Sequence, residues 1–149
     1  MIIIDGKATT QKIRQRLTEE VSNLKEKYNK IPGLAVIIVG DDAASKVYVN
    51  NKIKACKDVG IKSLNYELSA DISEKEVIDI IDKLNNDEEI NGILVQLPLP
   101  KHLNESLILS KIAVSKDVDG FSAYQMGKLV LGEKSLVACT PSGIIELLD

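Results

Sequence analysis

The chain of 149 residues is poor in several residue types, and each scarcity narrows its function. It has no tryptophan, one phenylalanine and four tyrosines, so few side chains could stack on a flat ligand. Its single histidine and its two cysteines, Cys56 and Cys139, stand in no spacing typical of a metal site. We therefore expect a cytoplasmic protein with two reduced thiols and no bound metal.

Charge and hydropathy exclude two further classes of partner. The 19 basic and 22 acidic residues give a net charge of -3, which offers no basic footprint for nucleic acid. No apolar run approaches the length of a membrane span, and the N-terminal MIIIDGK is too short for a signal peptide. With 44% hydrophobic residues, the chain is long enough for one soluble domain with its own core.

Short apolar runs alternate with helical patterns along the chain. Strands are expected at residues 2–4, 34–39, 62–68 and 93–96. Helices are expected to begin at Thr9 or Thr10, at Asp41 or Asp42, after Ser73, and at Thr140-Pro141, where Cys139 should pack. This alternation predicts a three-layer α/β/α domain, with a mostly parallel sheet covered by helices on both faces.

The helix that follows Asp42 places polar side chains along the edge of its buried stripe. The stripe is formed by Val49, Ile53 and Cys56. At about 100° per residue, Ser45, Tyr48 and Lys52 fall within roughly 60° of one another beside it. A half-buried lysine beside a tyrosine is a candidate acid/base centre. Taken alone, the pattern fits a solvated lysine that packs its stem on the tyrosine at least as well.

Gln96 stands where a strand meets the ligand-binding edge of an open α/β sheet. Pro98 and Pro100 cannot continue a strand ladder, so the chain must leave the sheet at Gln96. That exit aims the Gln96 amide into the same crevice as Lys52. A proline-rich exit loop with a solvent-facing glutamine is the alternative.

Two carboxylates, Asp117 and Asp119, flank one valine before Gly120. An extended segment would put them on one side, whereas a turn would part them. The functional interpretation is one structural aspartate and one that accepts hydrogen bonds from a ligand, and the alternative is a solvated turn. A lone Asp-x-Asp without further ligands does not indicate a metal site.

Seven segments resemble, in order, the N-terminal catalytic domain of the bifunctional methylenetetrahydrofolate dehydrogenase/methenyltetrahydrofolate cyclohydrolase family. They are VGDDAAS (39–45), YVNNK (48–52), KAC (54–56), GI (60–61), GILVQLPLP (92–100), KDVDGF (116–121) and CTPSG (139–143). Each is weak alone, but all seven in order are specific. The resemblance implies a domain of the amino-acid-dehydrogenase-like N-terminal type.

The resemblance also implies a chemistry. 5,10-methylenetetrahydrofolate would be oxidised with NADP or NAD, and the methenyl product would be hydrolysed to 10-formyltetrahydrofolate. Lys52 would move the protons of the hydrolysis, and Gln96 would hold its amine. Tyr48 would pack against the folate rings, Asp119 would accept hydrogen bonds from the pterin, and Ser45 is a further binding candidate.

The chain departs from the family at several places. The family usually has proline where this chain has Ala43 and Ala138. After Gly120-Phe121 it often reads His-Pro and then, two residues later, Asn. Ser122, Ala123 and Gln125 occupy those places here. These positions look structural or close to the cofactor.

No Gly-x-Gly-x-x-Gly fingerprint for a dinucleotide occurs in residues 1–149. We therefore expect the chain to be the tetrahydrofolate-binding catalytic domain of a longer protein, with 141–149 beginning a connecting helix. NADP would be bound mainly by a missing Rossmann domain, and the full-length enzyme would be a homodimer. A monofunctional dehydrogenase domain and a non-catalytic α/β ligand-binding module are the two alternatives.

Overall fold

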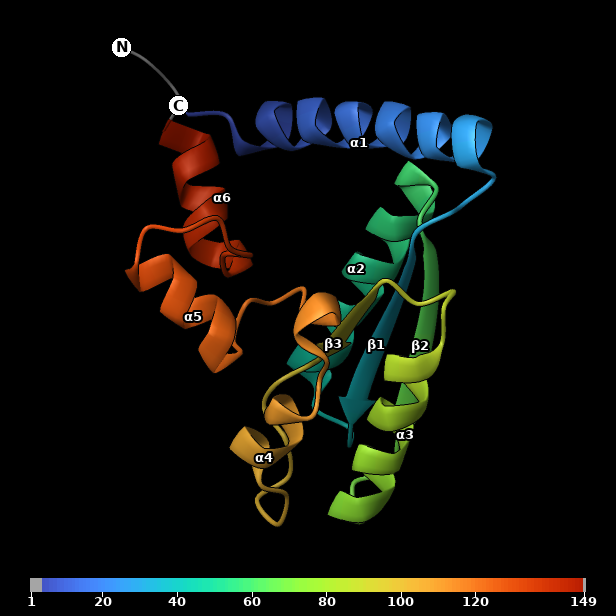
Figure 1. The fold of residues 1–149 in the computed structure, drawn as a ribbon, viewed down its shortest axis with the longest axis vertical. Helices are drawn as coiled ribbons and strands as arrows, with labels where there is room; N and C mark the ends of the chain where they lie inside the picture. Colours follow the sequence, from blue (N-terminus) through green and yellow to red (C-terminus); the bar gives the residue numbers. More distant parts are fainter. Residues whose placement is uncertain (1–3, 149) are drawn as a thin grey trace.

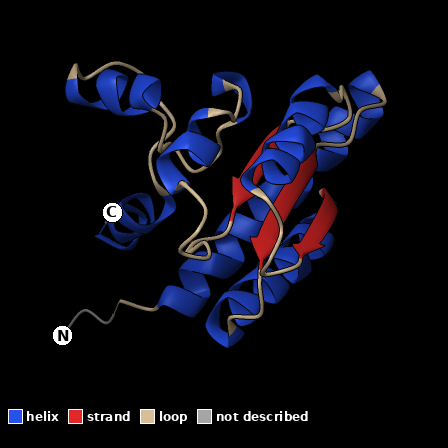
Figure 2. Cartoon of the chain, turned by 90° about the horizontal axis from the view of Figure 1, so that it is seen from below, coloured by secondary structure: helices blue, strands red, loops and turns tan. Residues whose placement is uncertain are grey.

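A computed structural model describes residues 4–148, which form a parallel sheet between two layers of helices (Figures 1 and 2). The strands are β1 (Gly33–Val39), β2 (Lys62–Leu68) and β3 (Gly92–Val95), in the order β2-β1-β3. The helices are α1 (Gly6–Tyr28), α2 (Ala43–Val59), α3 (Glu74–Asn86), α4 (Glu105–Ser110), α5 (Ala123–Val130) and α6 (Cys139–Leu148), with a 3-10 turn η1 (Val114–Lys116). The predicted three-layer α/β/α class is confirmed.

The central strand β1 is buried on both faces, because helices cover it from either side (Figure 2). Ala35, Ile37 and Val39 point into a core shared with α3, β3 and α4. Val36 and Ile38 point the other way and pack against Val49 of α2. This alternation follows from the two-residue period of a strand, and it explains why β1 reads as an unbroken apolar run.

All three strands are parallel, so their carboxyl ends meet at one edge of the sheet. The amide of Gln96 donates to the carbonyl of Ile37 at 2.8 Å, and the ladder ends there. β3 thus begins and ends one residue earlier than predicted, with Gln96 just beyond it. The expected exit from the sheet at Gln96 is confirmed, and it brings this residue beside α2.

Two predictions near the N-terminus need revision. Residues 2 and 3 of the expected first strand lie outside the described residues, and Ile4 is not in a strand. The first helix begins at Gly6 rather than at Thr9 or Thr10, because the Asp5 carboxylate accepts from the amides of Lys7 and Ala8. The two threonine hydroxyls donate to carbonyls one turn back, inside the helix.

The predicted boundaries of the middle helices hold, and those after β3 do not. Asp42 caps α2, Gly60 ends it in the left-handed region, and Ser73 forms the expected capping box with Glu76. The sequence reasoning missed α4 and α5, which are six and eight residues long. It placed the first residue of α6 at Pro141, two residues late, and expected Cys139 to pack, whereas that thiol is exposed.

No helix within residues 4–148 is long and apolar enough to cross a lipid bilayer.

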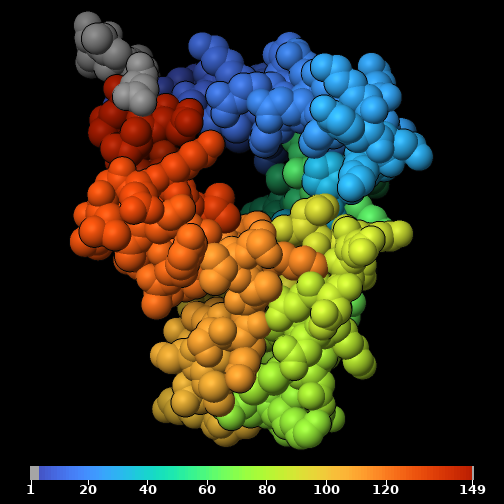
Figure 3. Space-filling view, viewed as in Figure 1, coloured from blue at the N-terminus to red at the C-terminus, as the bar shows by residue number. Residues whose placement is uncertain are grey.

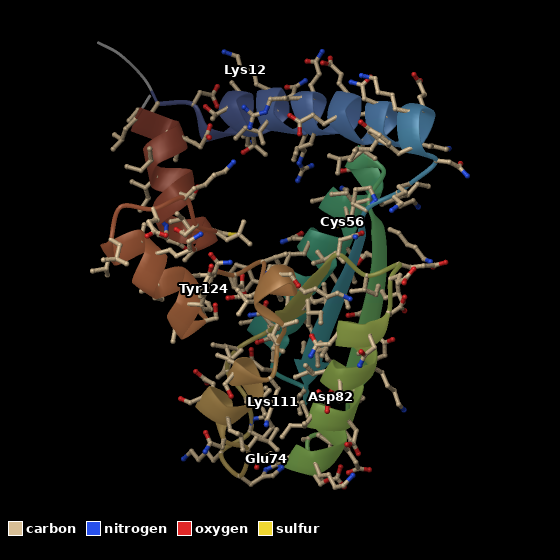
Figure 4. All side chains as sticks on the ribbon, in the orientation of Figure 1. Lys12, Cys56, Glu74, Asp82, Lys111 and Tyr124 are labelled. Carbon is tan, nitrogen blue, oxygen red and sulfur yellow. The ribbon has the colours of Figure 1, made fainter. Side chains whose placement is uncertain are left out.

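α1 lies across the end of α2, and the first residues of α1 contact α6 (Figure 1). Cys56 of α2 lies beneath α1, whereas Tyr124 of α5 lies away from the sheet (Figure 4). In the space-filling view the molecule is hollowed between α1, α6 and α2 (Figure 3).

Candidate active site

Lys52 and Gln96, 44 residues apart in the chain, meet at the edge of the sheet. The Nζ atom of Lys52 donates to Oε1 of Gln96 at 3.0 Å, and both side chains are half-buried. α2 supplies the lysine because it runs back along the sheet from the end of β1. The exit from β3 supplies the amide. The structure therefore brings together the two residues on which the predicted acid/base centre depends.

One backbone carbonyl, that of Leu97, organises this pair. It accepts a hydrogen bond from Nε2 of Gln96 at 2.8 Å, which fixes the amide so that its oxygen faces Lys52. It also lies 3.4 Å from the Oγ atom of Ser45, which donates to it. Ser45 is buried in the first turn of α2, where Asp42 accepts from its amide at 2.7 Å. The predicted folate contact of Ser45 stays a prediction.

Asp117 takes the structural role that the sequence predicted for one member of this pair, and the ligand-binding role of Asp119 stays a prediction. Asp117 is buried, and its two carboxylate oxygens accept from the amides of Gly120 at 3.0 Å and Ser122 at 2.8 Å. Asp117 is therefore the structural aspartate that shapes the turn. Asp119 is half-buried and, within the described residues, has no side-chain hydrogen bond that would occupy its carboxylate.

Burial raises the pKa of Asp119 above its ordinary value of 3.8. The positive charge of Lys52 opposes that rise, and the neighbouring carboxylate of Asp117 adds to it. The charge of Lys52 thus acts on the Asp119 carboxyl, which links Asp119 to the Lys52–Gln96 pair. A half-buried carboxylate without a side-chain hydrogen bond among the described residues can accept hydrogen bonds from a ligand.

Tyr48 lies one helical turn before Lys52, and 63% of its surface is exposed. The expected position on the rim of the buried stripe is confirmed, since Val49 and Cys56 of that stripe are buried. An exposed ring at the edge of a polar site provides an apolar face for a flat ligand. Its contact with a folate stays a prediction.

Three hollows of the described surface are lined by none of the predicted site residues. One of about 580 Å³ lies at the opposite end of the sheet, where Lys30, Asn91 and Lys116 are among its lining residues. It is open and polar, and it contains none of the predicted site residues. We place the site by its convergent polar groups, because a lysine, an amide and a free carboxylate carry chemistry that a polar hollow lacks.

Sequence reasoning missed two contributors to this region. The carbonyl of Leu97 has no side-chain signature, so only the folded backbone reveals it. Gln125 is buried on α5 and bonded to segments on both sides of it. No pattern in the sequence indicates that burial, because the apolar residues of α5 face outward.

Comparison with known proteins places these residues in context. Residues 4–119 match the family described as tetrahydrofolate dehydrogenase/cyclohydrolase, catalytic domain. The bifunctional protein FolD of Campylobacter hominis is 54% identical over 147 residues, which cover 99% of this chain and 51% of that protein. FolD of Nitratiruptor is 51% identical over 149 residues, covering 100% of this chain and 53% of that one. The chain thus spans about half the length of these relatives.

Solved structures agree with this relationship. The crystal structure of the bifunctional FolD methylenetetrahydrofolate dehydrogenase/cyclohydrolase from Campylobacter jejuni has a TM-score of 0.95 at 48% identity, covering 99% of this chain and 52% of that chain. The Trypanosoma brucei enzyme, solved in complex with NADP and an inhibitor, has a TM-score of 0.95 at 37% identity, with coverages of 99% and 50%.

Proposed function

Because this chain belongs to the tetrahydrofolate dehydrogenase/cyclohydrolase catalytic-domain family, we propose that it supplies the folate site and the catalytic lysine of a bifunctional enzyme. The enzyme oxidises 5,10-methylenetetrahydrofolate and hydrolyses the methenyl product to 10-formyltetrahydrofolate. The observation that carries the proposal is the hydrogen bond of 3.0 Å between Lys52 and Gln96, with Asp119 close enough to sense the lysine's charge.

The hydrolytic step requires proton movement at two places. Water must lose a proton as it attacks the methenyl carbon, and a ring nitrogen must gain one as the ring opens. An amine beside a cationic methenyl group is favoured in its neutral form, because two like charges repel. Lys52 can then take the proton from water and return it to the nitrogen, while Gln96 holds the amine in place.

The remaining residues orient the substrate. Asp119 accepts hydrogen bonds from the amino and ring N–H groups of the pterin, and this pairing is supported by its free carboxylate. Tyr48 packs its exposed ring against the folate. Ser45 acts by holding the Leu97 carbonyl that orients Gln96. Fixing the reacting atoms in this way removes an entropic barrier from both steps.

The turn after β1 does not provide the phosphate site that a dinucleotide needs. The turn after β1 reads Gly40-Asp41-Asp42, and the Asp42 carboxylate occupies the N-terminus of α2, where a phosphate would otherwise bind. We therefore assign the binding of NADP, which accepts the hydride in the first step, mainly to a further domain. In this proposal α6 begins the connection to that domain, the whole enzyme is a homodimer, and it works in the cytoplasm.

The test uses the 149-residue chain and two variants of it. Binding of 5-formyltetrahydrofolate, a stable folate, is measured by calorimetry, and hydrolysis of 5,10-methenyltetrahydrofolate by the loss of its ultraviolet absorbance. Lys52→Met is expected to lower the hydrolysis rate about 10²- to 10⁴-fold, the range for a general acid/base. Lys57→Met, an exposed lysine of the same helix, is the control and should leave it unchanged.

Two outcomes count against the proposal. A chain without affinity for 5-formyltetrahydrofolate has no folate site. A Lys52→Met variant that binds the folate and hydrolyses the methenyl substrate at the normal rate leaves the site in place but removes the lysine from the mechanism.

A further inference from the structure

Gln125 is buried in a helix whose apolar side chains face outward. It is 8% exposed and is the buried residue of α5, whereas Tyr124, Met126 and Val130 of the same helix are exposed. Burying a side-chain amide costs free energy unless it is hydrogen-bonded. The position of Gln125 therefore points to its hydrogen bonds as the reason for its burial.

Those hydrogen bonds join segments on both sides of α5. The Oε1 atom of Gln125 accepts from the amide of Leu136 at 3.0 Å. Its Nε2 atom donates to the carbonyl of Val114, at the start of η1, at 3.4 Å. Leu136 belongs to the irregular segment 133–138 between α5 and α6, which we name the strap. The amide thus ties the strap to the segment that leads into the Asp117 turn.

The strap lies directly on that turn. A Cβ atom added to Gly120 would be 2.5 Å from the carbonyl oxygen of Leu136, so only a glycine allows this approach. Gly120 also has φ of 69° and donates its amide to Asp117 at 3.0 Å. It is therefore held from one side by the buried carboxylate and from the other by the strap. Its neighbour in the chain is Asp119.

We propose that Gln125 is a positioning residue, which clamps the strap over Gly120 and so fixes the Asp119 carboxylate in the orientation that receives the pterin. This inference rests on the proposed folate site and adds to it a residue outside that site. Among the described residues, no hydrogen bond joins Gln125 to Lys52. It acts through two backbone groups, Leu136 N–H and Val114 C=O, that it holds in register.

The test replaces Gln125 by methionine, which has a similar length and shape but cannot make either hydrogen bond. Met126→Gln is the matched control, because it exchanges the same residue types at a position 45% exposed on the same helix. Binding of 5-formyltetrahydrofolate is measured by calorimetry for both variants. Gln125→Met is expected to weaken binding about tenfold, the equivalent of one hydrogen bond, and Met126→Gln to leave it unchanged.

A double-mutant cycle separates positioning from general destabilisation. In an Asp119→Asn background, where the carboxylate is already lost, Gln125→Met should weaken binding less than about twofold further. If Gln125→Met weakens binding by the same factor in both backgrounds, the residue supports the domain as a whole and the inference is overturned.

A second readout needs no folate, so it distinguishes failure of this inference from failure of the proposed function. Amide hydrogen exchange followed by NMR should accelerate at least about tenfold in Gln125→Met at Leu136 and also at Gly120. Acceleration at Leu136 alone would mean that the strap does not hold the turn, and would overturn the inference whether or not the chain binds folates. Absence of folate binding with acceleration at both amides would overturn the proposed function and the part of this inference that concerns the pterin, and it would leave the contact of the strap with Gly120 in place.

Discussion

Gly92, the first residue of β3, lies against the valine that separates the two aspartates of the site. A Cβ atom at Gly92 would be 2.5 Å from Cγ1 of Val118 and 3.2 Å from Cδ1 of Leu34. Val118 packs in the core beneath α2 and is held there by its neighbours. Gly92→Ala is therefore expected to push Val118, and with it the turn that carries Asp119, away from the sheet.

The size of the effect follows from the overlap. Ordinary contacts of a Cβ atom begin near 3.4 Å, so the added methyl group of Gly92→Ala overlaps Val118 by almost 1 Å. Overpacking of this kind costs about 1–3 kcal/mol. Val118→Ala alone removes two methyl groups that are partly buried and costs about 1–1.5 kcal/mol. The double variant removes the methyl group that clashes, so its cost should fall at least about 1 kcal/mol below the sum.

Equilibrium unfolding in urea, followed by circular dichroism, measures these changes. With a typical slope of about 2 kcal/mol per molar, a loss of 2 kcal/mol lowers the midpoint by about 1 M. Binding of 5-formyltetrahydrofolate should fall in Gly92→Ala and recover partly in the double variant. Additive free energies of unfolding, or a Gly92→Ala variant as stable as the parent chain, would refute the claim that Val118 transmits strain from β3 to Asp119.

Three further outcomes are expected. Asp119→Asn should raise the urea midpoint at pH 7, because burial holds the pKa of this carboxyl in the folded chain above 3.8. The stabilising contribution of Asp119 is therefore complete only below pH 3.8, and it is lost as the pH rises through the pKa of the folded state. A midpoint difference between variant and parent that does not vanish in acid would contradict this. Gly120→Ala should lower the free energy of unfolding in urea at least about 2 kcal/mol more than Gly132→Ala does. Both glycines have φ near 70°, but only at Gly120 would the added Cβ atom overlap a carbonyl oxygen, that of Leu136. Equal losses in the two variants would exclude that contact. A disulfide reagent should titrate Cys139 in the native chain and Cys56 only after unfolding, because burial covers the Cys56 thiol and raises its pKa; two rapidly reacting thiols would show this wrong.

The strands β1, β2 and β3 and the starts of α2 and α3 were predictable because each has a local cause. β1 is apolar at every position, and Asp42, Gly60 and Ser73 mark helix ends by side-chain chemistry within a few residues. Beyond β3 the local signals weaken. α4 and α5 are too short for a clear period, and α5 turns its apolar residues outward, so hydropathy gives no sign of which face is buried.

The site was predictable in part for the same reason. Lys52 and Tyr48 share a helix, and the prolines after Gln96 force its exit from the sheet, so both inferences needed only local geometry. The division of roles between Asp117 and Asp119 depended on which one accepts hydrogen bonds from the turn, which only the folded backbone decides. Hydrogen bonds to backbone carbonyl groups cannot be predicted from which side chains the sequence carries.

The choice of an amide as the partner of Lys52 fits the chemistry better than a carboxylate would. A carboxylate at the place of Gln96 would form an ion pair and hold the lysine as an ammonium, which cannot accept a proton from water. The Gln96 oxygen accepts a hydrogen bond from the amine in either protonation state, so it positions Nζ without fixing its charge. The carboxylate of the site, Asp119, is instead carried by a separate turn held by Asp117. In the proposed mechanism, the group that orients the lysine is separate from the group that receives the pterin, so one site would hold a cationic substrate and still release a proton to it.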